Sequence, residues 1–132
     1  MKLDDQKQQE LMYKLSMFEQ QMQLIQQQIE AIEQAVNETS LLNSGLESLK
    51  NPKDKEIFAS VGKGIYVKGK LLDEKLLVDV GGKRFVKKTV DETQETIKDQ
   101  IKKLREVKKE LENNLEKING ELERIFSEYQ GE

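Results

Sequence analysis

Residues 57–88 decide the fold, and they read IFASVGKGIYVKGKLLDEKLLVDVGGKRFVKK. Branched and aromatic residues gather here in short runs, a composition typical of β-strands. The runs are separated by Gly62-Lys63-Gly64, Asp73-Glu74 and Gly81-Gly82. Two consecutive glycines accept the positive φ angles of a tight turn, so Gly81-Gly82 predicts a two-residue hairpin loop. We therefore expect two β-hairpins, with strands at 57–61, 65–72, 76–80 and 84–87.

The residues before this segment have the pattern of a long helix, expected over about 5–49. From Leu11 the apolar residues recur in alternate steps of four and three, which is the period of a coiled-coil seam. Pro52 ends the helix, because proline disfavours helical geometry in the residue before it. The predicted seam consists of Leu11, Leu15, Phe18, Met22, Ile25, Ile29, Ile32 and Val36, followed by Thr39, Asn43 and Leu46.

The residues after the segment predict a second long helix, over about 90–130. It begins with a capping box in which Thr89 and Glu92 each satisfy a free backbone N–H group of the other. A lysine, Lys108, interrupts the apolar seam, and it either fixes the register or packs its stem while its amine reaches water. The seam consists of Ile97, Ile101, Leu104, Lys108, Leu111, Leu115, Ile118, Leu122, Ile125 and Tyr129.

Helices of similar length on either side of a short insert predict an antiparallel coiled-coil hairpin. If the two seams face each other, the residue numbers of paired positions add up to about 140, and the basic stretch at 98–109 lies beside Glu30, Glu33 and Glu38. We predict a mainly α chain with a small β part, organised as a single unit over 1–132. Its parts are an N-terminal coiled-coil helix at 1–50, two β-hairpins at 51–88 and a C-terminal coiled-coil helix at 89–132.

Four short strands cannot bury both faces of a sheet on their own, and isolated hairpins are marginally stable in water. Their open edges and apolar faces predict pairing with other subunits. The residues that we expect at this oligomerisation surface are Ile57, Phe58, Ile65, Val67, Leu71, Leu76, Val78, Val80 and Phe85.

The composition argues against an enzyme. The chain has no cysteine and no histidine, which removes thiol nucleophiles, the usual zinc ligands and the side chain that titrates near neutrality. We expect no catalytic residues, no cofactor and no metal site. The start has no basic-then-apolar signal pattern, and no apolar run approaches the length of a membrane span. We therefore expect a cytoplasmic protein with no membrane partner.

Two sequence motifs have a structural interpretation that competes with a functional one. Residues 64–70 match the start of a phosphate-binding loop, but Leu71 stands where Ser or Thr is needed to hold Mg²⁺, so a glycine-containing strand is the better interpretation. The basic pairs Lys83-Arg84 and Lys87-Lys88 lack an aromatic platform beyond Phe85. A solvated strand edge that discourages mispairing is favoured over binding of nucleic acid.

The hairpin segment resembles the α-class subunits of prefoldin, a hexameric chaperone. Val61-Gly62-Lys63-Gly64-Ile65-Tyr66-Val67-Lys68-Gly69-Lys70-Leu71, followed by Leu77-Val78-Asp79-Val80-Gly81-Gly82, is similar to the hairpins of that class. Four strands favour the α class, because β-class subunits carry a single hairpin. The resemblance implies an α2β4 hexamer of two copies of this chain and four β-class subunits, whose strands form an intersubunit β-barrel. It also implies that the coiled coils hold unfolded proteins without ATP and pass them to a group II chaperonin.

The same resemblance implies that the coiled-coil tips bind the clients. Met12, Tyr13, Met17 and Phe126 are apolar side chains there beyond the seam, and flexible methionines suit promiscuous contacts. The alternative is that these residues only complete the coiled coil. The full set expected at the tips is Leu11, Met12, Tyr13, Leu15, Met17, Phe18, Leu122, Ile125, Phe126 and Tyr129.

Two other functions compete with a chaperone role. The first is a prefoldin-like structural scaffold whose hairpins polymerise into a filament and which transfers no client. The second is a helical hairpin that binds nucleic acid through the basic half of the second helix, for which a strong salt dependence of binding is the diagnostic observation.

Overall fold

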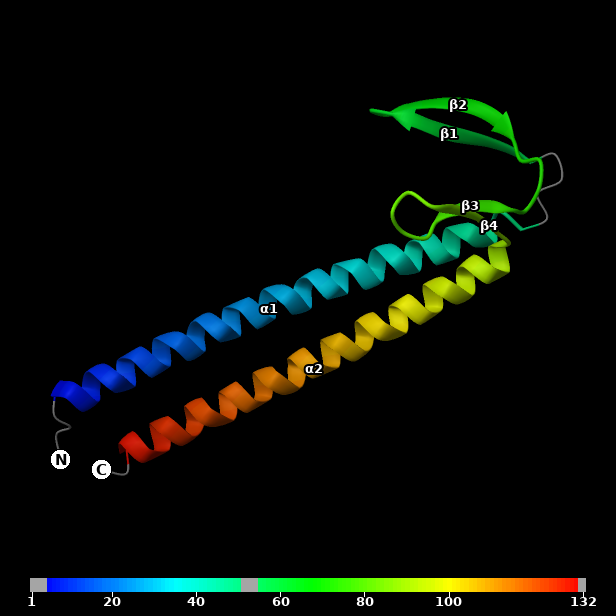
Figure 1. The fold of residues 1–132 in the computed structure, drawn as a ribbon. Helices are drawn as coiled ribbons and strands as arrows, with labels where there is room; N and C mark the ends of the chain where they lie inside the picture. The colour runs from blue at the N-terminus through cyan, green and yellow to red at the C-terminus, as the bar shows by residue number, and fades with distance from the viewer. Residues whose placement is uncertain (1–4, 51–54, 131–132) are drawn as a thin grey trace. The chain divides into compact units, whose positions relative to one another are not determined.

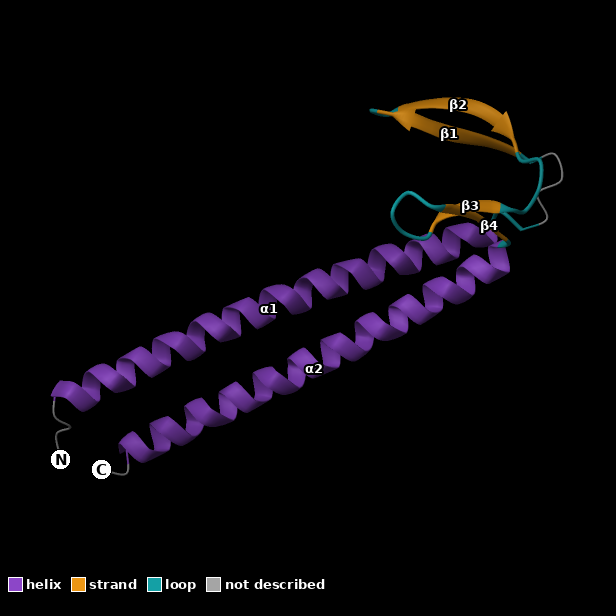
Figure 2. Ribbon diagram, in the orientation of Figure 1, coloured by secondary structure: helices purple, strands orange, loops and turns teal. Residues whose placement is uncertain are grey.

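The computed structural model describes residues 5–50 and 55–130, and side chains up to Glu128. Its elements are, in order, α1 (Asp5–Glu47), β1 (Glu56–Gly62), β2 (Ile65–Lys70), β3 (Leu76–Asp79), β4 (Phe85–Lys88) and α2 (Val90–Gln130) (Figure 1). Two long helices with two small antiparallel hairpins between them confirm the predicted fold class (Figure 2). The predicted role of Pro52 in ending α1 lies outside the described residues.

The chain divides into two compact units. The helical unit comprises α1 up to Asn37 and α2 from Lys102. The hairpin unit comprises Glu38–Ile101 and therefore holds all four strands and the ends of the helices that adjoin them.

In the helical unit the predicted seam is the half-buried side of each helix, from Leu11 to Val36 in α1 and from Leu104 to Ile125 in α2. Lys108 Nζ of α2 lies 3.2 Å from Glu33 Oε1 of α1 and 3.7 Å from Glu112 Oε1. The numbers of Lys108 and Glu33 add up to 141, which confirms the predicted register of about 140. The Lys108 amine thus contacts a carboxylate of the facing helix, while its stem occupies the seam.

The buried core of the hairpin unit is formed by Leu46, Val90 and Ile97. Val90 has only 1% of its surface exposed, and Leu76 of β3 packs against this cluster. Each such side chain contributes about 2 kcal/mol when it is fully removed from water. The cluster therefore joins the end of α1, the start of α2 and the second hairpin.

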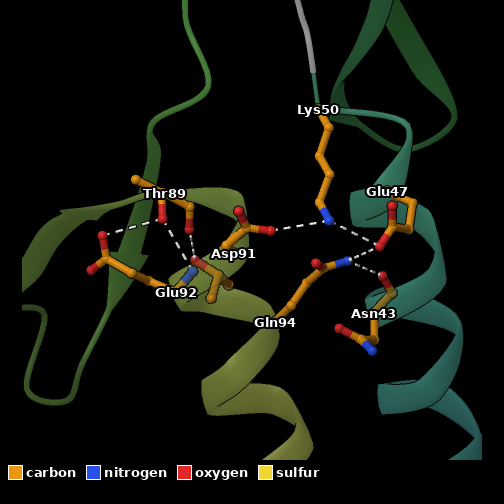
Figure 3. Close-up of polar contacts among 8 residues, drawn as sticks. Asn43, Glu47, Lys50, Thr89, Asp91, Glu92 and Gln94 are labelled. Atoms are coloured by element: carbon orange, nitrogen blue, oxygen red, sulfur yellow. Dashed lines mark hydrogen bonds and ion pairs between the residues drawn. The ribbon is translucent and has the colours of Figure 1, made fainter.

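The first turn of α2 is capped, although not as predicted. The backbone N–H of Glu92 donates to Thr89 Oγ1 over 3.1 Å, which confirms one half of the capping box. The other half was wrong, because Glu92 Oε1 accepts a hydrogen bond from the Thr89 hydroxyl at 3.2 Å and not from the Thr89 backbone (Figure 3). A hydroxyl can accept from one group and donate to another, so both bonds form at the same oxygen.

The two hairpins share one kind of turn. In each, valine and a glycine with φ of 118° precede two residues with positive φ: Lys63 and Gly64 in the first, Gly82 and Lys83 in the second. Positive φ at both central residues is the signature of a type I′ turn. In the second hairpin Arg84 N donates to Gly81 O over 3.1 Å, so the turn is centred one residue later than the predicted Gly81-Gly82 loop.

Each turn is shifted by one residue because the first strand of the hairpin contains an extra residue just before the turn. In the first hairpin Ser60 pairs with Tyr66 and Gly62 with Ile65, so the register shifts across Val61. In the second, Val80 N donates to Arg84 O over 2.8 Å, while Asp79 pairs with Phe85. In each hairpin the first strand therefore contains one residue more than a simple two-residue loop between paired strands would require.

Candidate assembly and client-binding surfaces

The hairpin of β1 and β2 leaves both of its faces open. Directly opposed residues point to the same side, so Ala59 and Val67 share one face while Phe58 and Lys68 share the other. Phe58 has 71% of its surface exposed, and Val67 has 50%. Both faces are therefore largely exposed within the described residues, although Ile57, on the face of Ala59 and Val67, is half-buried.

The hairpin of β3 and β4 has one covered face and one open face. The inner face carries Leu76 and Val78, which are half-buried, and Leu76 contacts the core. The outer face carries the opposed pairs Leu77–Lys87 and Asp79–Phe85. Leu77 and Phe85 are both exposed, so the outer face offers apolar surface bordered by charges.

The residues predicted for oligomerisation fall into two groups. The exposed group consists of Phe58, Ile65, Val67, Val80 and Phe85. Ile57, Leu71, Leu76 and Val78 are half-buried within the chain. Sequence reasoning missed other large apolar side chains that the hairpin region exposes, and these are Val61, Tyr66, Leu72, Leu77 and Val86.

Neither alternation nor strand pairing would have identified Leu77 as an exposed residue. Leu76, Leu77 and Val78 are consecutive apolar residues, so alternation alone does not tell the inner face from the outer one. Each leucine lies opposite a lysine, Leu76 opposite Lys88 and Leu77 opposite Lys87. The helix ends cover the side of Leu76, and this tertiary contact decides which of the two leucines is on the inner face.

The residues predicted at the tips belong to the helical unit, and they too fall into a half-buried group and an exposed group. Leu11, Leu15, Phe18, Leu122 and Ile125 are half-buried members of the seam. The surplus residues Met12, Tyr13, Met17 and Phe126 are exposed, and Met12 has 70% of its surface open. Tyr129 lies in α2, but its side chain is outside the described part of the chain.

A second apolar surface of the helical unit was not foreseen. Leu24 is exposed next to the seam residue Ile25, and both line a groove of about 380 Å³ between the two helices. Ile118 lines the same groove from α2. An apolar residue beside a seam residue is the sequence signal for such a groove.

A polar cluster in the hairpin unit links the end of α1 to the start of α2 (Figure 3). Gln94, which is buried, donates through Nε2 to Asn43 O at 3.2 Å and to Glu47 Oε1 at 3.0 Å. Lys50 Nζ lies 3.1 Å from Glu47 Oε1 and 3.0 Å from Asp91 Oδ1. The hydrogen bond from Gln94, followed by that from Lys50, lowers the pKa of Glu47 below its usual value. The hydrogen bond to Asp91, followed by that to Glu47, raises the pKa of Lys50.

This polar cluster has a structural task. Its carboxylates are bound to an amide and an ammonium group. The cluster holds the two helix ends that carry the hairpins. Neither described helix is apolar over a stretch long enough to cross a bilayer.

The chain is similar to known proteins over most of its length. The family model for prefoldin, described as "Prefoldin subunit", matches residues 18–132. "Prefoldin subunit alpha" of Methanobrevibacter smithii is 34% identical over 117 residues, which are 88% of this chain and 75% of that protein. "Prefoldin subunit alpha 1" of Methanocaldococcus jannaschii is 30% identical over 119 residues, or 89% of this chain and 82% of that protein. A solved structure, the cryo-EM structure of filamentous PFD from Methanocaldococcus jannaschii, has the same fold, with a TM-score of 0.79 and 22% identity over 88% of this chain and 98% of that chain.

Proposed function

The chain belongs to the prefoldin family as an α-class subunit, and from this premise we propose that it is one component of an ATP-independent chaperone. Family membership supports a chaperone role and argues against an enzymatic one. In our proposal the coiled-coil tips capture non-native proteins in the cytoplasm and pass them to a group II chaperonin. The observation that carries the proposal is the exposure of Met12, Tyr13, Met17 and Phe126 beside a half-buried seam.

We propose that the hairpins assemble this chain with a second copy of itself and with four β-class subunits, joining their strands into a β-barrel. The open faces of β1–β2 and the outer face of β3–β4 support this proposal, because soluble chains rarely leave so many apolar strand residues uncovered. The free strand edges support it further, since unpaired backbone groups favour pairing with another chain.

Each coiled coil is one arm of the proposed assembly, and the presence of several arms explains how weak tip contacts hold a client. Each tip offers a few flexible apolar side chains, which bind many sequences and none tightly. Once one arm binds, the others act at a high effective concentration, so weak contacts add up without new surface. A holdase of this kind needs no nucleotide, because it binds the unfolded state by mass action.

The test is suppression of aggregation of a chemically unfolded protein, without ATP, by this chain assembled with a β-class subunit. The test variant replaces Met12, Tyr13, Met17 and Phe126 by serine. The matched control replaces four comparably exposed apolar residues away from the tips, Leu24, Leu41, Leu42 and Val107, also by serine. We expect the tip variant to lose suppression and the control to keep it. Loss in the control alone would move the client site away from the tips.

A second candidate function is a filament-forming scaffold without client transfer. The chain of similar fold comes from a prefoldin described as filamentous, and this observation favours the alternative. Electron microscopy of the purified chain on its own separates the two functions. Filaments from the chain alone, together with no suppression by either the tip variant or the unaltered assembly, would favour the scaffold.

A further inference from the structure

The strand segment has a charge opposite to that of the helices. The described residues 55–88 include nine Lys and Arg against four Asp and Glu, a net charge of +5. Residues 5–50 have three basic against seven acidic side chains, and residues 90–130 have eight against eleven, so these segments carry −4 and −3. The region with the most open apolar strand surface is therefore also the basic region of the chain.

The second hairpin concentrates this charge. Residues 76–88 contain Lys83, Arg84, Lys87 and Lys88 against a single carboxylate, that of Asp79. That carboxylate already has a partner within the turn, because Asp79 Oδ1 accepts a hydrogen bond from Gly81 N at 2.9 Å. In the part of the chain that the structure describes, Lys83, Arg84 and Lys87 form no ion pair.

The unpaired cations border the open apolar face. Lys87 lies opposite Leu77 on the outer face of β3–β4, and Phe85 shares that face. Arg84 is exposed next to Phe85 at the end of the turn. The outer face thus has an apolar centre, formed by Leu77 and Phe85, and a basic rim, the general layout of a specific protein interface.

We propose that the outer face of β3–β4 docks onto an acidic surface of a different subunit and not onto the same face of a second copy. The proposal rests on the assembly proposed above and adds the chemistry of the partner. A symmetric contact places the same patch on both sides, so two hairpins of net charge +3 would meet with their cations together. Like charges at an interface suppress that pairing, whereas an acidic partner gains both attraction and faster association.

The test measures binding of a recombinant β-class prefoldin subunit to this chain as a function of salt. The test variant is Arg84→Glu with Lys87→Glu, which leaves the positive-φ residue Lys83 unchanged. The control is Lys102→Glu with Lys103→Glu, two exposed α2 residues whose reversal changes the net charge equally. Leu77→Ser removes apolar surface without changing charge. Far-ultraviolet circular dichroism verifies that each variant is folded.

We expect R84E/K87E to weaken binding by about tenfold or more at about 50 mM salt, and by much less at about 500 mM, where screening is strong. The α2 control stays within about twofold of the unaltered chain. We also expect self-association of the unaltered chain to increase with salt, because screening reduces repulsion between like hairpins.

Unchanged binding of R84E/K87E together with weakened binding of L77S would overturn the proposed partner chemistry and leave the assembly proposal intact. Binding unaffected by either variant would show that this face is no docking surface. The tip variants test the chaperone proposal separately, so its failure is distinguishable from both outcomes.

Discussion

The helical unit and the hairpin unit place their apolar side chains differently. In the helical unit the seam of α1 faces the seam of α2, so most of the apolar residues are half-buried within one chain. In the strands, Phe58, Ile65, Tyr66 and Leu77 each have 60% or more of their surface exposed. A helix pair completes its own seam, whereas two separate two-stranded sheets leave faces and edges that only another chain can cover.

Stability and assembly therefore depend on different surfaces of this chain. The core at Leu46, Val90 and Ile97 and the polar cluster around Gln94 stabilise the hairpin unit from within. The outer strand faces add nothing to that core and are free to serve a partner. Substitutions on the two kinds of surface therefore have separable effects, which the following variants test.

The largest effect is expected for Val90→Asp. A carboxylate at a position with 1% exposure and apolar neighbours loses its hydration without gaining a partner, and we expect the free energy of unfolding to fall by about 4 kcal/mol or more. Urea unfolding followed by circular dichroism measures it. Val107→Asp, the same change at an exposed site of α2, is the control and should cost less than about 0.5 kcal/mol. Equal costs would show that the core does not stabilise the hairpin unit.

The next effect separates the two faces of β3. Leu77→Asp places a carboxylate opposite Lys87, a favourable cross-strand pair, so the isolated chain stays stable while assembly weakens by about 2 kcal/mol. Val78→Asp places it on the inner, half-buried face and lowers both stability and assembly. Light scattering gives the size and thermal unfolding gives the stability. An assembly of full size with Val78→Asp would contradict the assignment of the strand faces.

A smaller effect concerns the shared turn. Gly81 has φ of 118°, so Gly81→Ala strains the backbone and should cost about 1–2 kcal/mol in the free energy of unfolding. Lys83 already adopts a positive φ of 61°, so Lys83→Gly relieves strain there and should cost little or even stabilise. Thermal unfolding of both variants measures the contrast. The opposite order would rule out the type I′ turn at Gly82 and Lys83.

The smallest effect is a pH dependence of the polar cluster. The pKa of Glu47 is lowered from 4.5, so its contribution to stability is present above pH 4.5 and is lost as the pH falls through the lowered pKa. The pKa of Lys50 is raised from 10.5, so its contribution is present below pH 10.5 and is lost at higher pH. Glu47→Gln should flatten the acid side of the melting-temperature profile while leaving the alkaline side in place. An unchanged acid slope would show that Glu47 does not stabilise the folded state.

The sequence predicts the helices well because their signal is repeated. Eleven seam positions from Leu11 to Leu46 are half-buried or buried as expected, and the register follows from setting the two seams face to face. The existence and number of the strands were also predicted, since glycine-rich separators bound each run.

Other features of the hairpin unit depend on tertiary contacts that a local pattern does not contain. The turn at Gly82 and Lys83 is displaced by an extra residue on the first strand, which two adjacent glycines do not reveal. Val90, next to the cap, is the most buried side chain among the described residues, although the predicted seam begins only at Ile97. Gln94 is buried because Asn43 and Glu47 of the other helix accept its hydrogen bonds, and nothing in its own neighbourhood in the sequence indicates them.

The polar link between Gln94 and Glu47 also has a consequence for the order of folding. It joins residues 47 apart in the sequence, whereas the ion pair between Lys108 and Glu33 joins residues that are farther apart. Closing the shorter loop loses less chain entropy, and each further turn of the two helices then pairs with its neighbours already in place. We expect the two helices to pair first at this link and then progressively toward the chain ends, and to separate in the reverse order. The surface proposed to hold unfolded clients is then the last part of the chain to fold and the first to loosen.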